Sequence, residues 1–388
     1  MTPVHVLHIS CDYPDTVRVE KTRAVANLIS KSNGLRHTVL SLNRSSRPFY
    51  WEKTDNLFSI NYCAPPLGIF MHQGLKRICD RLCALVDFDF DIIHAHKFSI
   101  EGMIGARMSR TFGKPLLITV RGHTDLTILR AKPHYRRQYQ DVAGTASHFF
   151  FLAPWTCKPF QKLLGRTLPA TSFLPNITHS HPRSEPRISD RFVTTVNYKA
   201  KNHRAKNIEA LLRGFRKLLQ IPGYTRYGLD IYTCPSLVPP RVRSLTDSPL
   251  LAGRVRFKSI TSNENFIRDL ADYIAFVRPS YPETFGMVYI ESLLAGVPAL
   301  HSRNTAIDGY FDDYDFIKKV PPGSPGSICK AMIELVDNQL KYKQTLSRHI
   351  EHGTFYSFSQ KSIIQNYKKT IEKTLSKKSI STKNNFAA

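Results

Sequence analysis

Short apolar runs alternate with amphipathic stretches along almost the whole chain, and this alternation constrains the fold more than any other feature. In the first half, runs of strand length are separated by stretches with apolar residues at helical spacing. The expected strands are 4–9, 37–42, 91–95, 116–120 and 148–152, and the expected helices are 21–32, 75–86 and 100–110. Because strands separated by helices form right-handed βαβ units, we predict a mostly parallel sheet with helices on both faces.

A proline-rich segment, 175–191, interrupts the alternation and marks a linker. A second series then follows, with expected strands 192–196, 229–233, 255–257, 274–277 and 298–301 and expected helices 208–219, 288–295, 327–337 and 361–375. The sequence therefore predicts an α/β protein with two Rossmann-like, doubly wound domains, 1–180 and 190–357, facing each other across a cleft. We expect the helix in 358–375 to cross back to the N-terminal domain, and residues 376–388 to form a flexible tail.

The chain is strongly basic, with 55 Lys and Arg against 30 Asp and Glu and a formal net charge of +25. This balance excludes an acidic solvating protein and indicates an anionic partner: nucleotide phosphates, nucleic acid or an acidic membrane surface. Ten basic residues of the first domain are candidates for a membrane-facing surface, and ordinary solvated helix faces are an equal alternative. The ten are Arg18, Lys21, Arg23, Lys76, Arg77, Arg81, Arg107, Arg110, Arg136 and Arg137.

Seven scattered cysteines without a Cys-x-x-Cys pair indicate a reducing compartment. The N-terminus begins directly with an apolar alternation and shows no signal peptide, and no run approaches the ~18 to 20 apolar residues of a membrane span. We therefore expect a cytoplasmic protein, with peripheral attachment to the inner face of the plasma membrane as the alternative.

The segment most informative about function is 278–300, RPSYPETFGMVYIESLLAGVPAL. An expected strand leads into a polar loop that holds Glu283, and Gly286 then opens a helix that contains Glu291. A glycine at a helix start lets a ligand approach the backbone, and the free N–H groups together with the helix dipole form an anion site. Carboxylates on both sides of that site suit the hydroxyls of a sugar–diphosphate–ribose chain. The alternative is a capping acid plus a solvated helix glutamate.

The same segment resembles the hallmark of a large family of retaining glycosyltransferases, often called family 4, which has the two-Rossmann GT-B architecture. The family pattern is P-S-x-x-E-x-F-G-x-x-x-x-E-x-x-x-x-G-x-P, and this chain matches it with Pro279, Ser280, Glu283, Phe285, Gly286, Glu291, Gly296 and Pro298. The resemblance implies that Glu283 contacts the donor sugar and that Glu291 contacts the ribose of the nucleotide. It also implies a bacterial enzyme of exopolysaccharide or lipopolysaccharide synthesis.

A basic loop, 197–206, follows an expected strand and precedes an expected helix. A cationic loop in that position suits a pyrophosphate, and a solvated loop is the alternative. The segment resembles the family's strand, Gly-Arg, loop, Lys-Gly/Asn signature, with Lys206 in the lysine position. Asn197-Tyr198 stands where the family has Gly-Arg, so the phosphate-clamping arginine is missing from its usual position. Lys199 or Lys201 is the candidate substitute. A lysine ammonium, however, cannot donate two parallel hydrogen bonds to a phosphate as an arginine guanidinium does.

Polar residues also follow two expected strands of the first domain. His94 and His96 end one of them, and Arg121 and His123 follow the next. The region resembles the family's Asp-Ile-Ile-His-x-His and Thr-x-His-Gly-x-Asp patterns, except that Arg121 occupies the histidine position and His123 lies two residues later. Either residue could face the reacting centre. His94 and His96 share one face of a strand, as metal ligands can, but no third ligand is evident and we expect no metal.

Together with the resemblance, the sequence predicts a retaining, metal-independent hexosyltransferase that uses a UDP- or GDP-sugar donor, needs no cofactor, and acts on a glycan or lipid-linked acceptor. Catalysis is assigned to Glu283, His123 and Arg121, and donor binding to Lys206, Lys199, Glu291, Phe285, Gly286 and Met287. One alternative is a nucleic-acid-binding protein that uses its basic surface, but no such module is visible and we expect no nucleic-acid partner. The other is a GT-B sugar epimerase or phosphorylase.

Overall fold

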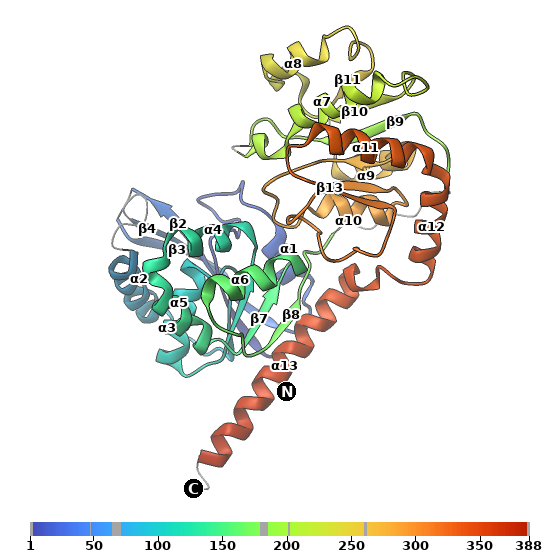
Figure 1. Ribbon diagram of the computed structural model, residues 1–388. Helices are drawn as coiled ribbons and strands as arrows, with labels where there is room; N and C mark the ends of the chain where they lie inside the picture. The colour runs from blue at the N-terminus through green and yellow to red at the C-terminus, as the bar shows by residue number, and fades with distance from the viewer. Residues whose placement is uncertain are drawn as a thin grey trace. The chain divides into compact units, whose positions relative to one another are not determined.

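The computed structural model describes residues 3–46, 48–63, 71–178, 185–200, 202–259 and 262–385, without the side chains of 71, 72, 263 and 378–385. The chain forms two compact units (Figure 1). The N-terminal unit comprises Met1–Leu152, Thr156–Ile177 and Gln360–Ala388, and the C-terminal unit comprises Ala153–Trp155 and Thr178–Ser359. Lys201 of the basic loop and residues 179–184 of the predicted linker lie outside the described residues.

The N-terminal unit is built on an eight-stranded sheet in the order β3-β4-β2-β1-β5-β6-β7-β8. The strands are β1 (His5–Ser10), β2 (Arg36–Ser45), β3 (Tyr50–Thr54), β4 (Leu57–Cys63), β5 (Ile92–Ala95), β6 (Leu116–Val120), β7 (His148–Phe151) and β8 (Thr171–Phe173). The helices are α1 (Ala24–Lys31), α2 (Met71–Leu85), α3 (Ile100–Phe112), α4 (His123–Ala131), α5 (Arg136–Thr145), α6 (Cys157–Leu164) and α13 (Gln360–Asn385). Strands β1, β5 and β6 are buried along their whole length, as parallel strands covered on both faces must be.

The β3–β4 hairpin was not expected from the sequence. It pairs antiparallel at the edge of the sheet, and β3 (Tyr-Trp-Glu-Lys-Thr) is largely exposed. An edge strand with one solvated side carries charges and therefore lacks the continuous apolar run that signals a buried parallel strand.

The C-terminal unit is built on a six-stranded parallel sheet in the order β11-β10-β9-β12-β13-β14. Its strands are β9 (Arg191–Thr195), β10 (Gly228–Tyr232), β11 (Val255–Lys258), β12 (Phe276–Val277), β13 (Ala299–Ser302) and β14 (Ile317–Val320). Its helices are α7 (Ile208–Leu219), α8 (Pro240–Thr246), α9 (Asn263–Asp269), α10 (Met287–Leu294), α11 (Pro325–Asp337) and α12 (Gln339–Glu351). This is the strand order of a doubly wound dinucleotide-binding sheet, in which the winding reverses between β9 and β12.

Helix α13 belongs to the N-terminal unit and lies beside β8, where Asn366 Nδ2 donates a hydrogen bond to the Phe173 carbonyl at 2.9 Å (Figure 1). Its apolar face supplies Ile363, Tyr367 and Ile371 to a core cluster of that unit. The helix continues to Asn385 and so includes most of the segment that composition assigns to a flexible tail; residues 386–388 lie outside the described residues. Within the described ranges, no helix combines the length and the apolar character needed to cross a membrane.

Candidate active site

The loops that follow β9 and β12 meet at the switch point of the C-terminal sheet. Asn207 ends the first loop with a positive φ of 53°, and its side-chain Nδ2 donates to the carbonyl of Pro279 in the second loop at 2.8 Å. The backbone N–H of Tyr281 donates to the Ala205 carbonyl at 2.7 Å. These two bonds join loops that are more than seventy residues apart in the sequence. Ligands of open α/β sheets bind at such a switch point, outside the carboxyl ends of the strands.

Glu283 lies in the second loop and makes two ion pairs through a single carboxylate oxygen. Its Oε2 is 2.5 Å from Lys206 Nζ and 3.3 Å from a terminal guanidinium nitrogen of Arg278. Thr305 holds the Glu283 backbone from the other side, since its hydroxyl accepts from the Glu283 N–H and donates to the Glu283 carbonyl, each at 2.7 Å. Two cations therefore converge on one carboxylate at the place where the sequence predicted a diphosphate.

The pKa directions in this group follow from burial and from those cations. Burial acts to raise the pKa of Glu283, but Arg278 and then Lys206 outweigh it and hold this pKa below its ordinary value. The pKa of Lys206 is also lowered, first by burial and then by repulsion from Arg278, against the opposing effect of Glu283. Glu283 is therefore ionised at neutral pH and pairs with two cations.

Helix α10 begins at this site. Its N-cap, Gly286, has a φ of 68°, and a Cβ built there would lie 2.5 Å from the ring of Tyr289, so the position requires glycine for two independent reasons. Met287 is the first helical residue, and Glu291 lies one turn further on, 4% exposed. Phe285 is also buried, at 1% exposed, and a donor-binding role for it stays a prediction.

Lys199 lies in the loop after β9 with an exposed side chain, and its backbone N–H donates to Asn197 Oδ1 at 3.0 Å. Lys206 thus meets Glu283 in the structure, whereas no bond between Lys199 and the Glu283 group is found in the described part of the chain. A ligand role for Lys199 stays a prediction.

In the N-terminal unit, Arg121 and His123 occupy the end of β6 and the start of α4. Arg121 is 7% exposed; its Nε donates to the His96 carbonyl at 3.1 Å and a terminal nitrogen donates to Asn176 Oδ1 at 3.3 Å. Its backbone N–H donates to Asp125 Oδ2 at 2.7 Å. Burial raises the pKa of Asp125 to about 6. His123 is the first residue of α4 and is half-buried.

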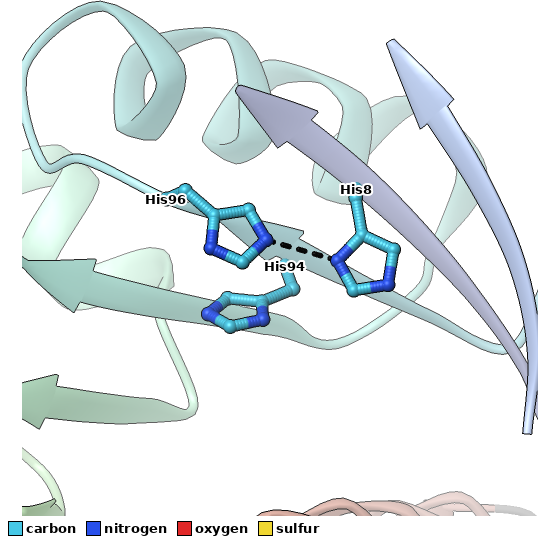
Figure 2. A group of neighbouring side chains, drawn as sticks. All are labelled: His8, His94 and His96. Atoms are coloured by element: carbon cyan, nitrogen blue, oxygen red, sulfur yellow. Dashed lines mark hydrogen bonds between the residues drawn. The ribbon is translucent and has the colours of Figure 1, made fainter. Parts of the chain in front are cut away.

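A third imidazole joins His94 and His96, which corrects the expectation that no further ligand accompanies them. His8 of β1 is the register partner of His94 on β5, and its Nδ1 is 2.9 Å from His96 Nε2 (Figure 2). All three rings are buried, and their ligand nitrogens lie within 4.8 Å of one another. Burial keeps the pKa of each far below its ordinary value, that of His94 at about 3, so all three are neutral.

Hydrogen bonds within the unit involve both ring nitrogens of His8 and of His94, and Nε2 of His96. His8 Nε2 is 2.9 Å from His37 Nδ1, and the two nitrogens of His94 are bonded to Tyr367 and Thr119. An ion among the rings would break the His8–His96 bond and would place a divalent charge close to the buried Arg121 cation, which already depresses the His94 and His96 pKa values. The donor set therefore fits a buried hydrogen-bonded network better than a metal centre.

Arg278 is the residue of this site that the sequence reasoning missed. It directly follows the buried strand β12, where a polar side chain points to the carboxyl edge of the sheet, and that position was the available signal. The family resemblance assigns it no role, because the family pattern begins at Pro279.

Comparisons with known proteins agree with this fold. No protein-family model matches the chain, and no curated protein matches it significantly. Solved structures do match: sucrose-phosphate synthase from Thermosynechococcus elongatus has a TM-score of 0.66 at 16% identity, covering 95% of this chain and 98% of that one. HepE from Anabaena, solved in complex with UDP, has a TM-score of 0.66 at 14% identity, covering 95% and 100%.

The lipopolysaccharide outer core galactosyltransferase WaaB, solved in its apo form, is similar at a TM-score of 0.67 and 13% identity, covering 95% of this chain and 99% of that one. At these identities the likeness bears on the fold and not on the reaction. The two parallel-sheet units, with the strand order described above, have the GT-B fold.

Proposed function

We propose that this protein is a retaining glycosyltransferase that moves a hexose from a nucleoside-diphosphate sugar to a glycan or lipid-linked acceptor. The observation that carries the proposal is the convergence of Lys206, Arg278 and Glu283 at the switch point of a doubly wound sheet, next to the glycine that starts α10. The similar solved proteins support it, since their names describe sugar-phosphate synthesis, galactosyl transfer or a UDP complex.

Lys206, Glu291, Glu283 and the start of α10 each have a role in that reaction. Lys206 and the free N–H groups at the start of α10 would hold the diphosphate, Glu291 the ribose, and Glu283 the transferred hexose. The bond between the anomeric carbon and the diphosphate oxygen breaks, and the acceptor oxygen bonds to the same face of the sugar while its proton passes to the leaving phosphate oxygen. Cations and helix amides already in place stabilise the leaving charge, which is why we propose a reaction without a metal.

The acceptor belongs to exopolysaccharide or lipopolysaccharide synthesis in this proposal, at the inner face of the plasma membrane. Several of the ten basic residues predicted for a membrane surface are neutralised, since Lys21 pairs with Asp15, Arg107 with Asp80 and Arg110 with Asp141. Membrane contact therefore depends on the remaining charges. Sedimentation with anionic and neutral vesicles at low salt tests it, and equal binding to both would exclude an electrostatic membrane surface.

A thermal-shift screen tests the core of the proposal. The purified protein is heated with UDP, GDP, ADP, CMP or a random RNA oligomer, with and without EDTA. A ligand at a hundred times its Kd adds about 2.7 kcal/mol to the free energy of unfolding, so one nucleotide should raise the Tm regardless of chelator. A salt-sensitive shift with RNA and none with nucleotides would favour the nucleic-acid alternative.

Turnover with the selected donor then tests metal independence. Transfer should continue in excess EDTA, and complete loss that manganese restores would contradict the metal-free mechanism. Substitution of Glu283 or Glu291 by Ala tests the two glutamates in the same assay. Glu264→Ala, at an exposed glutamate of the same unit, is the matched control and should leave both binding and transfer unchanged.

A further inference from the structure

We propose that Arg278 is the guanidinium that binds the donor diphosphate in this chain, and that Glu283 competes with the diphosphate for Arg278 and Lys206 until the donor is bound. The inference rests on the proposed function and names a residue and a coupling within the same site. It answers the question raised by Asn197-Tyr198, which leaves the usual position of a phosphate-clamping arginine without one.

Arg278 is held in place before any ligand arrives. Its guanidinium lies over the rings of Phe276 and Tyr289, at 5.4 and 5.1 Å from the two centroids, and the Tyr289 hydroxyl donates to the Arg278 carbonyl at 2.5 Å. Its backbone N–H donates to Leu300 at 3.1 Å, which continues the β12–β13 ladder. A guanidinium packed against two rings at a strand end has little rotamer freedom left to lose on binding.

Arg278 also retains hydrogen-bonding capacity. The side chain is 9% exposed, and its Nε is buried without an acceptor among the described residues. The bond to Glu283 is long, at 3.3 Å, in contrast to the 2.5 Å contact between Glu283 and Lys206. A buried guanidinium with a weak partner and an unused donor is suited to a second anion, and a phosphate accepts from such a fork in a bidentate way.

Glu283 is the intramolecular anion that occupies this position in the absence of donor. Because the same oxygen, Oε2, accepts from both cations, a diphosphate that takes both cations frees that oxygen. Glu283 then has Oε2 available for the hydroxyls of the transferred hexose, in addition to Oε1, which accepts from the Thr284 N–H at 3.3 Å. Diphosphate binding and the release of the sugar-side carboxylate are thus coupled through two side chains.

The experiment compares nucleoside diphosphate and nucleoside binding by calorimetry in four proteins: wild type, Arg278→Met, Glu283→Gln and Arg268→Met. UDP, GDP, ADP and CDP are the probes, each with its nucleoside. Met keeps an apolar side chain against the two rings and removes the charge, and Gln keeps the shape of Glu283. Arg268 is an exposed arginine of the same unit and is the matched control.

Arg278→Met should weaken binding of the diphosphate about ten- to a hundredfold, the scale of a hydrogen bond to a charged group, with nucleoside binding unchanged. Glu283→Gln should tighten diphosphate binding about tenfold because the competing charge is gone, while transfer of the hexose falls about a hundredfold. Arg268→Met should bind as the wild type does.

Equal diphosphate affinity in wild type and folded Arg278→Met would overturn the role of Arg278. Unchanged or weaker diphosphate binding by Glu283→Gln would overturn the competition. This measurement stays informative even if Arg278→Met does not fold, because Glu283 is partly exposed, with 14% of its side chain accessible, and its substitution should not prevent folding. When either of these two results overturns the inference, the wild type still binds a nucleoside diphosphate. If wild type binds none of the four, the proposed function fails as well, so the two failures are distinguishable.

Discussion

At the scale of single residues, Glu283 and Glu291 have different surroundings and hence different expected roles. Glu283 sits between two cations at the mouth of the site, with its backbone held by Thr305. Glu291 is buried inside α10, close enough to Arg278 to act on the pKa of that guanidinium. A group at the reacting sugar affects the transition state, whereas a group at the ribose contributes equally before and during the reaction.

We therefore expect Glu283→Ala to lower kcat about a hundredfold or more, the scale of losing a positioned electrostatic group. Glu291→Ala should instead raise the donor KM while changing kcat little, because it removes uniform binding. Steady-state kinetics with varied donor measure both constants. Unchanged kinetics in both variants would remove the glutamate pair from the mechanism.

At the scale of elements, α13 completes the N-terminal unit from the far end of the sequence. Tyr367 is fully buried, and its hydroxyl is 2.9 Å from Nδ1 of His94. Its ring also lies 5.4 Å from the His94 ring and 5.9 Å from that of Phe150. The helix is therefore a structural part of this unit, fixed both by apolar packing and by a buried polar contact.

Tyr367→Ala should lower the free energy of unfolding by about 3–5 kcal/mol, as for other large aromatic truncations in a core. Tyr367→Phe removes only the hydroxyl and should cost about 1 kcal/mol. Urea unfolding monitored by circular dichroism measures both. Lys369→Ala, at an exposed position of the same helix, is the control and should leave the transition midpoint in place. A Tyr367→Ala protein as stable as the control would contradict the packing role.

At the scale of the whole molecule, the buried histidines make stability depend on pH. Burial lowers the pKa of His94 to about 3 and that of His148 to about 4, and the pKa values of His5, His8, His37 and His96 are lowered as well. These imidazoles take up protons near pH 6.5 in the unfolded chain and only at a lower pH in the native one. Asp125 has the opposite sign, because its native carboxyl binds a proton at about pH 6, above the range of an unfolded aspartate.

The free energy of unfolding should therefore fall as the pH is lowered from about 7 towards 4. Each buried neutral histidine contributes up to about 1.4 kcal/mol per pH unit in that interval, and Asp125 offsets one of them over part of it. Urea unfolding at several pH values measures the slope. His148→Gln should make it shallower, and stability that is constant between pH 7 and 5 would contradict the neutral native imidazoles.

Much of this architecture follows from local pattern. The apolar runs that predicted β1, β5, β6 and β7 do form buried strands. They could be predicted because an apolar run is a local pattern that depends only on neighbours in sequence. Gly286 could be placed at a helix start for the same reason. It is the N-cap of α10, with a positive φ of 68° that favours glycine. The edge hairpin β3–β4 was missed, because half-solvated strands do not form continuous apolar runs.

What only the tertiary structure decided is which distant residues meet. Arg278 lies close to Lys206 because the sheet places β12 beside β9. Helices α7, α8 and α9 and strands β10 and β11 separate the two strands in sequence, and local periodicity does not specify strand order. His8 joins His94 for the same reason, through the β1–β5 pairing. The sequence by itself determined the class of fold, the helix start at Gly286 and two members of the group formed by Lys206, Glu283 and Arg278. The third, Arg278, emerged only from strand order, since side-chain proximity is a property of long-range packing.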